Sequence, residues 1–122
     1  MNEIQKLLEE IAQSLDHVIS ISLVGMDGLV IAEYTSEEVE STDYSSAQMT
    51  TVMTRLVDVF DQVKMGKMVD NLLSTEAGHF LTRFIGDGTV FLSIVCTRGT
   101  NLGAMRYASK IYDKKISELL PH

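Results

Sequence analysis

The chain has 122 residues, 45% hydrophobic and 22% charged, a balance typical of one globular domain with a buried core rather than of a disordered segment. Its formal net charge of −7 argues against nucleic acid or anionic lipid as the main partner, because both would be repelled. The only cysteine, Cys96, excludes an internal disulfide framework, and every apolar run is too short to span a bilayer. We therefore expect one domain over residues 1–122, soluble and cytoplasmic, with no signal peptide and no membrane insertion.

The first third of the chain predicts an amphipathic helix followed by a β-hairpin. Asn2–Leu15 carries apolar residues three and four positions apart, with charged residues between them, as in a helix that buries one stripe. Val18–Val24 partly alternates with serine, and Leu29–Tyr34 is a second apolar run. Asp27-Gly28 separates the two runs, and glycine adopts the positive φ that a tight hairpin turn requires. We expect these two strands to be antiparallel.

A polar, acidic segment from Thr35 to Asp43 predicts a loop, and a long helix over Tyr44–Val63 follows it. The apolar residues of this helix cover about 160° of its circumference, more than the ~100° needed to face one core. They are Met49, Val52, Met53, Leu56, Val57, Val59, Phe60 and Val63. Such a stripe indicates either a deeply embedded helix or a helix that contacts its own sheet on one flank and a second chain on the other. We favour the second interpretation, because polar residues still occupy the far side.

The rest of the chain predicts three strands and a final helix. Lys67–Thr75 has charged and amide groups in its middle, which is typical of a sheet edge. His79–Ile85 is the next strand, and Thr89–Cys96 is apolar enough to be buried on both faces at the centre of the sheet. Asn101–Leu120 has a helical apolar stripe, and Pro121 stops it. The order α-β-β-α-β-β-β-α thus predicts an α/β (α+β) fold with one five-stranded sheet and helices on both faces.

Signatures of covalent, phosphate and metal chemistry are missing from the sequence. There is no phosphate-binding Gly-x-x-x-x-Gly-Lys-Ser/Thr loop, and Gly86-Asp87-Gly88 lacks the third glycine of a dinucleotide-binding motif. Neither His-Glu-x-x-His nor Cys-x-x-Cys occurs, and His17, His79 and His122 are scattered. We therefore predict no catalytic residue, no cofactor and no metal site, and a protein that is not an enzyme.

The order of elements and several short motifs resemble the Roadblock/LC7 domain family. The motifs are Asp27-Gly28, Glu76-Ala77-Gly78, Asp87-Gly88 and Asn101-Leu102-Gly103-Ala104-Met105-Arg106, the last at the start of the final helix. Each motif is short, and their order and spacing carry the resemblance, which covers about residues 3 to 119.

This resemblance implies a non-enzymatic module with a profilin-like antiparallel sheet in the spatial order 2-1-5-4-3. It also implies a homodimer formed through the second helix and the third strand, here Tyr44–Val63 and Lys67–Thr75. On that basis we expect six residues at the dimer surface: Met49, Met53, Leu56, Phe60, Met68 and Leu72. The family binds and regulates Ras-like small GTPases, including as a GTPase activator, or serves as an adaptor in dynein and lysosomal complexes.

Three functions follow as hypotheses. The first is a cytoplasmic homodimer that binds a Ras-like small GTPase and biases its nucleotide state. The second is a passive scaffold or adaptor subunit with the same dimer and no effect on nucleotide turnover. The third is a small-ligand sensor that uses the same layout of sheet and helices.

Overall fold

The computed structural model describes residues 2–36 and 43–121, and its elements follow the expected order. The helices are α1 (Asn2–Ser14), α2 (Asp43–Gln62) and α3 (Leu102–Leu119). The strands are β1 (Val18–Gly25), β2 (Val30–Thr35), β3 (Asp70–Ser74), β4 (Gly78–Ile85) and β5 (Val90–Thr97). Most of the expected loop from Thr35 to Asp43 lies outside the described residues.

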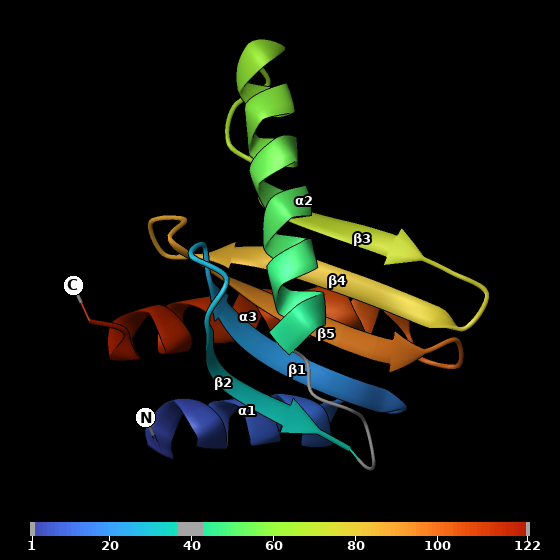
Figure 1. Ribbon diagram of the computed structural model, residues 1–122. Coiled ribbons are helices and arrows are strands. Elements are labelled where there is room, and N and C mark those ends of the chain that lie inside the picture. Colours follow the sequence, from blue (N-terminus) through green and yellow to red (C-terminus); the bar gives the residue numbers. More distant parts are fainter. Residues whose placement is uncertain (1, 37–42, 122) are drawn as a thin grey trace.

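The five strands form one antiparallel sheet in the order β2-β1-β5-β4-β3 (Figure 1). β5 lies at its centre, and all of its residues except Val95 and Thr97 are buried. β3 forms one edge of the sheet. The expected central strand, the expected edge strand and the implied spatial order are therefore all confirmed.

Helices α1 and α3 cover one face of the sheet and form the main core with it (Figure 1). The apolar stripe of α1 is buried there because its residues recur every three or four positions and so share one side of the helix. The fully buried side chains of this core include Ile4, Leu8, Ile11, Ile21, Leu23, Leu81, Leu92, Ile94, Met105 and Ile116. Burying each such side chain stabilises the folded state by about 1.5–3 kcal/mol.

Helix α2 lies on the opposite face, over a much smaller apolar cluster. Val24, Met53 and Phe91 are the buried members of this cluster. The adjacent row of the sheet on the same face is polar, because Ser22, Ser93, Thr82 and Asn71 lie opposite one another across β1, β5, β4 and β3. The C-terminal half of α2 rises clear of the sheet (Figure 1). Helices thus cover both faces, as expected, but the α2 layer is thin.

Strand β3 is shorter than the expected Lys67–Thr75. After α2, the chain turns through Lys64 and Gly66, whose φ angles are +57° and +86°. Met68 then packs against the small cluster beneath α2, so the chain keeps to that side of the sheet before it joins β4. Pairing with β4 begins only at Asp70, opposite Arg83.

Candidate interaction surface

One flank of α2 leaves apolar side chains exposed. Val52, Val59 and Val63 are 40%, 51% and 55% exposed. Val63 directly follows the last residue of α2, its N–H still donates to the Val59 carbonyl, and we call these three residues the outer flank of α2. Together with the half-buried Met49 and Leu56, they recur at alternating steps of three and four residues, the spacing of helices that pack along each other. An exposed apolar stripe with this spacing is typical of a helix that contacts a second helix.

The open edge of β3 adds apolar surface on the same face of the sheet. Val69, which directly precedes β3, is 61% exposed, and Leu73 within β3 is 43% exposed. Leu73 lies opposite Phe80 of β4, on the face that carries α2, whereas Leu72 points to the other face and packs against the main core. The other edge strand, β2, instead exposes the charged Glu33. Leu73 therefore places an exposed apolar side chain on the face of the sheet that carries α2.

The main chain of β3 presents hydrogen-bonding groups at this edge. The Thr75 N–H donates to the Gly78 carbonyl at 2.8 Å, so Thr75 directs its main-chain groups toward β4. In an antiparallel pair, residues alternate between facing the partner strand and facing away from it. Asp70, Leu72 and Ser74 therefore direct their N–H and C=O groups outward, where a further strand could pair with them.

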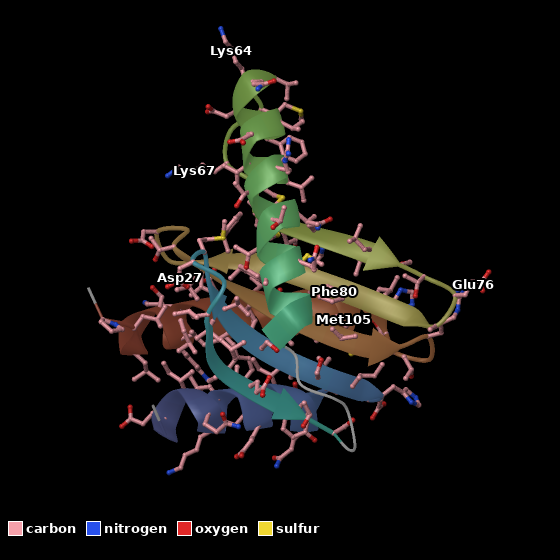
Figure 2. The ribbon with its side chains drawn as sticks, viewed as in Figure 1. Asp27, Lys64, Lys67, Glu76, Phe80 and Met105 are labelled. Carbon is pink, nitrogen blue, oxygen red and sulfur yellow. The ribbon has the colours of Figure 1, made fainter. Side chains whose placement is uncertain are left out.

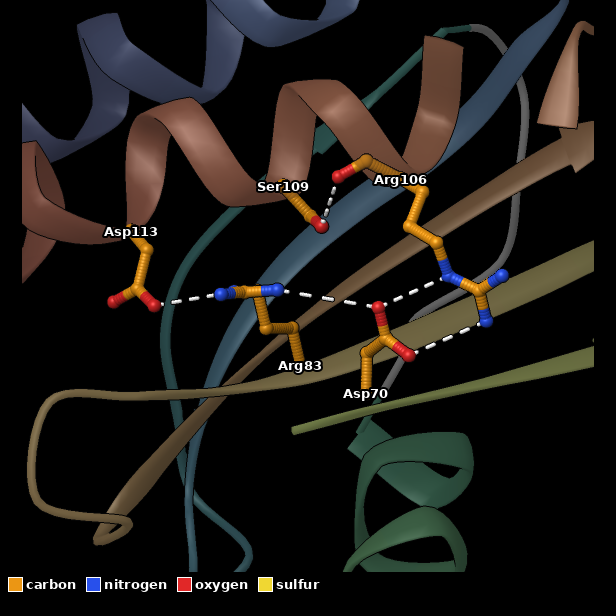
Figure 3. A network of polar contacts seen from close by, with 5 residues as sticks. All are labelled: Asp70, Arg83, Arg106, Ser109 and Asp113. Atoms are coloured by element: carbon orange, nitrogen blue, oxygen red, sulfur yellow. Dashed lines mark hydrogen bonds and ion pairs between the residues drawn. The ribbon is translucent and has the colours of Figure 1, made fainter. Parts of the chain in front are cut away.

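An ion network fixes the start of β3 to α3 (Figure 3). Arg83 Nε lies 3.1 Å from the Asp113 carboxylate, and an Arg83 terminal nitrogen lies 3.9 Å from Asp70. Arg106 donates to both carboxylate oxygens of Asp70, at 3.0 and 3.2 Å. The side chains of Arg83 and Asp70 are only 14% and 16% exposed, so water screens their interaction less than at the open surface. The network holds β3 in place while its outer edge stays open.

The one cysteine is not set up as a nucleophile. Cys96 is fully buried, and this burial raises the pKa of its thiol, with a partial offset from the hydrogen bond to Thr100. The thiolate is the reactive form, so this environment disfavours thiol chemistry. Among residues 2–36 and 43–121, no group of three His, Cys, Asp or Glu side chains is arranged to hold a metal ion. No helix in these same two ranges has the length and apolar character needed to cross a membrane.

The six residues expected at a dimer surface fall into three environments. Met53 is fully buried within its own chain, and Leu72 lies on the opposite face of the sheet. The other four are half-buried: Met49, Leu56, Phe60 and Met68. The expected set consists of large side chains, whereas the outer flank of α2, Val69 and Leu73 are more exposed than any of the six. The alternating spacing of the flank is the sequence signal that identifies it.

This arrangement of sheet, helices and edge strand is the Roadblock/LC7 fold. A Roadblock/LC7 domain from Streptomyces avermitilis has a TM-score of 0.84 at 16% sequence identity, covering 93% of this chain and 94% of that one. MglB from Myxococcus xanthus has a TM-score of 0.90 at 12% identity, covering 98% of this chain and 95% of its own. The resemblance seen in the sequence is thus confirmed at the level of the fold.

The profilin-like character of the sheet is confirmed as well. LokiProfilin1, solved in a complex with rabbit actin, has a TM-score of 0.64 at 17% identity, covering 98% of each chain. No protein-family model matches the sequence, and no curated protein matches it. At these low identities, the likenesses establish the fold alone.

Proposed function

We propose that this chain is one Roadblock/LC7-like domain over residues 1–122 and forms a non-enzymatic, cytoplasmic homodimer that binds and regulates a Ras-like small GTPase. The observation that carries the proposal is the outer flank of α2 beside the open, apolar edge of β3. The fold supports it, because resemblance to Roadblock/LC7 domains implies a dimer through this helix and this strand and a GTPase as partner. No cofactor or metal is part of the proposal.

The geometry of an edge strand restricts how two copies can pair. In one continuous antiparallel sheet, the two-fold axis is perpendicular to the sheet, so residues that lie opposite each other point to the same face. The two-fold axis must then pass between two equivalent residues, so one residue of β3 lies opposite the same residue of the second copy. Leu72 is the middle residue of β3, and a ladder centred on it uses the outward main-chain groups of Asp70, Leu72 and Ser74. This arrangement also brings the two α2 helices to the same face, where their outer flanks can meet.

A charge on the outer flank should separate the dimer. Val59→Glu would place a carboxylate in an apolar contact, which costs several kcal/mol when the charge has no partner. Val59 is 51% exposed within its own chain, so the variant should still fold. Phe60→Glu should also split the dimer, but it is a less clean test because Phe60 is half-buried.

Analytical ultracentrifugation at micromolar concentration measures this effect. The wild type should sediment as a dimer and Val59→Glu as a folded monomer. Val57→Glu is the matched control, since Val57 is 41% exposed on the opposite flank of α2, and its dimer mass should not change. A monomeric wild type, or a dimeric Val59→Glu, would contradict the proposed dimer.

The regulatory part of the proposal is tested with a Ras-like GTPase from the same organism. Nucleotide release and hydrolysis are measured with and without the dimer, and complex formation is followed by size-exclusion chromatography. We expect a complex and a change in at least one of the two rates. A complex with unchanged rates would favour the passive scaffold, and the absence of both a complex and a rate change would reject the GTPase assignment.

A further inference from the structure

A groove runs along the side of α2 that faces away from the outer flank. Two hollows of about 880 and 530 Å³ lie there, and both are lined by Val57, Phe84 and Gly88. The first hollow continues to the β1–β2 turn, and the second continues to residues 66–69, between α2 and β3. Figure 2 shows Asp27 and Lys67, which line the two hollows, on the same side of α2. We call the joined hollows the turn groove.

The lining of the turn groove is apolar and open to solvent. Leu29 is 68% exposed and Val57 is 41% exposed. Half-buried Met26, Val30 and Phe84 lie beside them. Leu29 directly follows the Asp27-Gly28 turn, a position where polar residues are usual. Exposed apolar side chains that gather around a hollow are typical of a site for a protein partner.

Hydrogen bonds hold the walls of the groove in place. The Asp27 carboxylate accepts from the Leu29 N–H at 3.0 Å, and the Asp87 carboxylate accepts from the Thr89 N–H at 3.0 Å. The Met26 N–H donates to the Thr89 carbonyl at 2.9 Å, which joins the two turns. A groove built in this way is already formed before a partner binds, so binding loses little conformational entropy.

The rim of the groove is acidic. Among the described residues that line it, two carry a positive charge, Arg83 and Lys67, and Arg83 is already engaged by Asp70 and Asp113. Four further carboxylates line the two hollows: Asp27, Asp58, Asp61 and Asp87. The charge of the groove therefore favours a basic partner.

Self-association would leave this groove open. Val57 and Val59 are two residues apart on a helix, so their side chains point about 160° away from each other. The outer flank can therefore contact a second copy while Val57 still faces the turn groove. The groove then stays accessible to a different partner.

We propose that the turn groove binds a surface segment of the small GTPase that carries an exposed apolar side chain flanked by lysine or arginine. The inference rests on the proposed function for the identity of the partner, and on the apolar lining and acidic rim for its chemistry. The apolar side chain enters between Val57 and Leu29, and the flanking cations face Asp58 and Asp61.

A pair of charge reversals tests the contact with the GTPase. Asp58→Lys/Asp61→Lys is preferred to changes at Asp27 or Asp87, because those two carboxylates support the turns. Biosensor kinetics should show association about tenfold slower, with a weaker dependence on salt. Glu9→Lys/Glu118→Lys is the matched control, since it makes the same change of net charge at exposed sites on α1 and α3.

Three results would overturn the inference in this experiment. The control pair could slow association as much as the groove pair, which would indicate a general charge effect. The groove pair could bind as fast as the wild type. The groove pair could lower the dimer mass in ultracentrifugation, which would assign the groove to self-association.

A peptide probe keeps the inference testable even if no GTPase binds. The probe is a short synthetic peptide with a Leu-Phe pair between lysines, and its twin carries glutamates in place of the lysines. In amide nuclear magnetic resonance spectra of the wild-type dimer, the lysine peptide should shift the signals of Val57, Phe84 and Gly88, and the twin should not. Unmoved signals, or equal shifts with both peptides, would reject the groove, whereas a missing GTPase complex alone would reject only the proposed function.

Discussion

Met53 makes the main buried contact between α2 and its own sheet. It is fully buried, in a cluster whose other buried members are Val24 and Phe91. The next row of the sheet presents Ser22 and Ser93, which offer α2 little apolar contact. Met49 and Leu56 pack against the same cluster but stay half-buried, so Met53 makes the largest buried apolar contribution to holding α2.

Met53→Ala should lower the free energy of unfolding by about 2–5 kcal/mol, because it removes buried apolar surface and leaves a cavity. Its exposed neighbour provides the control, since Val52→Ala should change this free energy by less than about 1 kcal/mol. Both changes are best measured by urea unfolding in the monomeric Val59→Glu background, where dimerisation does not contribute. Equal losses at the two positions would show that Met53 is not the main buried contact of α2.

Cys96 makes the stability of the fold depend on pH at the alkaline end. Burial raises the pKa of its thiol above the ordinary value of 9.0, so the folded chain keeps the proton after the unfolded chain has begun to lose it. The free energy of unfolding is unaffected by this group below about pH 9 and falls as pH rises further. Wild type should thus lose stability more steeply than Cys96→Ala between neutral pH and pH values above 9, as measured by thermal unfolding. Parallel pH profiles would show that the thiol titrates equally in both states.

At the scale of elements, α2 and β3 are each bound on one side and open on the other. α2 presents Met53 to its own sheet and the outer flank to solvent. β3 pairs with β4 along one edge, and its first residue, Asp70, is bound to Arg83 and Arg106. The ion network therefore orders the edge strand on which the proposed dimer depends.

Arg83 and Arg106 should differ in their contribution to stability. Arg83→Met removes the partner of two carboxylates at a site that is 14% exposed, and we expect a loss of about 2–3 kcal/mol. The side chain of Arg106 is 53% exposed, so Arg106→Met should lose at most about 1 kcal/mol. Urea unfolding of the two variants in the Val59→Glu background gives the comparison. If Arg106→Met proved the more destabilising change, the network would not anchor β3 through Arg83.

At the scale of the whole molecule, the two faces of the sheet are covered unequally. α1 and α3 bury a large core on one face, whereas the other face carries a single helix over a small cluster and a polar row. A second copy placed beside β3 would add its own α2 to this thin layer. The proposed dimer therefore contributes to the stability of the fold as well as providing a surface for a partner.

Thermal stability should consequently depend on protein concentration. Because dimerisation favours the folded state by mass action, the Tm of the wild type should rise with concentration. The Tm of Val59→Glu should be lower and independent of concentration, and Val57→Glu should behave like the wild type. Differential scanning fluorimetry over a dilution series measures all three, and a wild-type Tm that stays constant on dilution would contradict a dimer linked to folding.

The sequence alone determined the order of the elements, the central position of β5 and the edge position of β3. These features depend on local patterns: a short apolar run between turns, charged residues within a strand, and glycines where a hairpin needs positive φ, as at Gly28 and Gly88. The sequence also indicated that α2 has more apolar surface than one core requires. That excess follows from counting residues around a helix and needs no knowledge of neighbouring elements.

Only the tertiary structure decided which apolar residues remain at the surface. Spacing cannot distinguish Met53, which is buried, from Val52, which is exposed, because both lie within one wide stripe. The face of Leu72 depends on its register with Leu81, and the start of β3 depends on how Met68 packs beneath α2. The turn groove is built from segments about 60 residues apart in sequence that the sheet brings together. Contacts of this kind follow from strand pairing and packing, which no local pattern encodes.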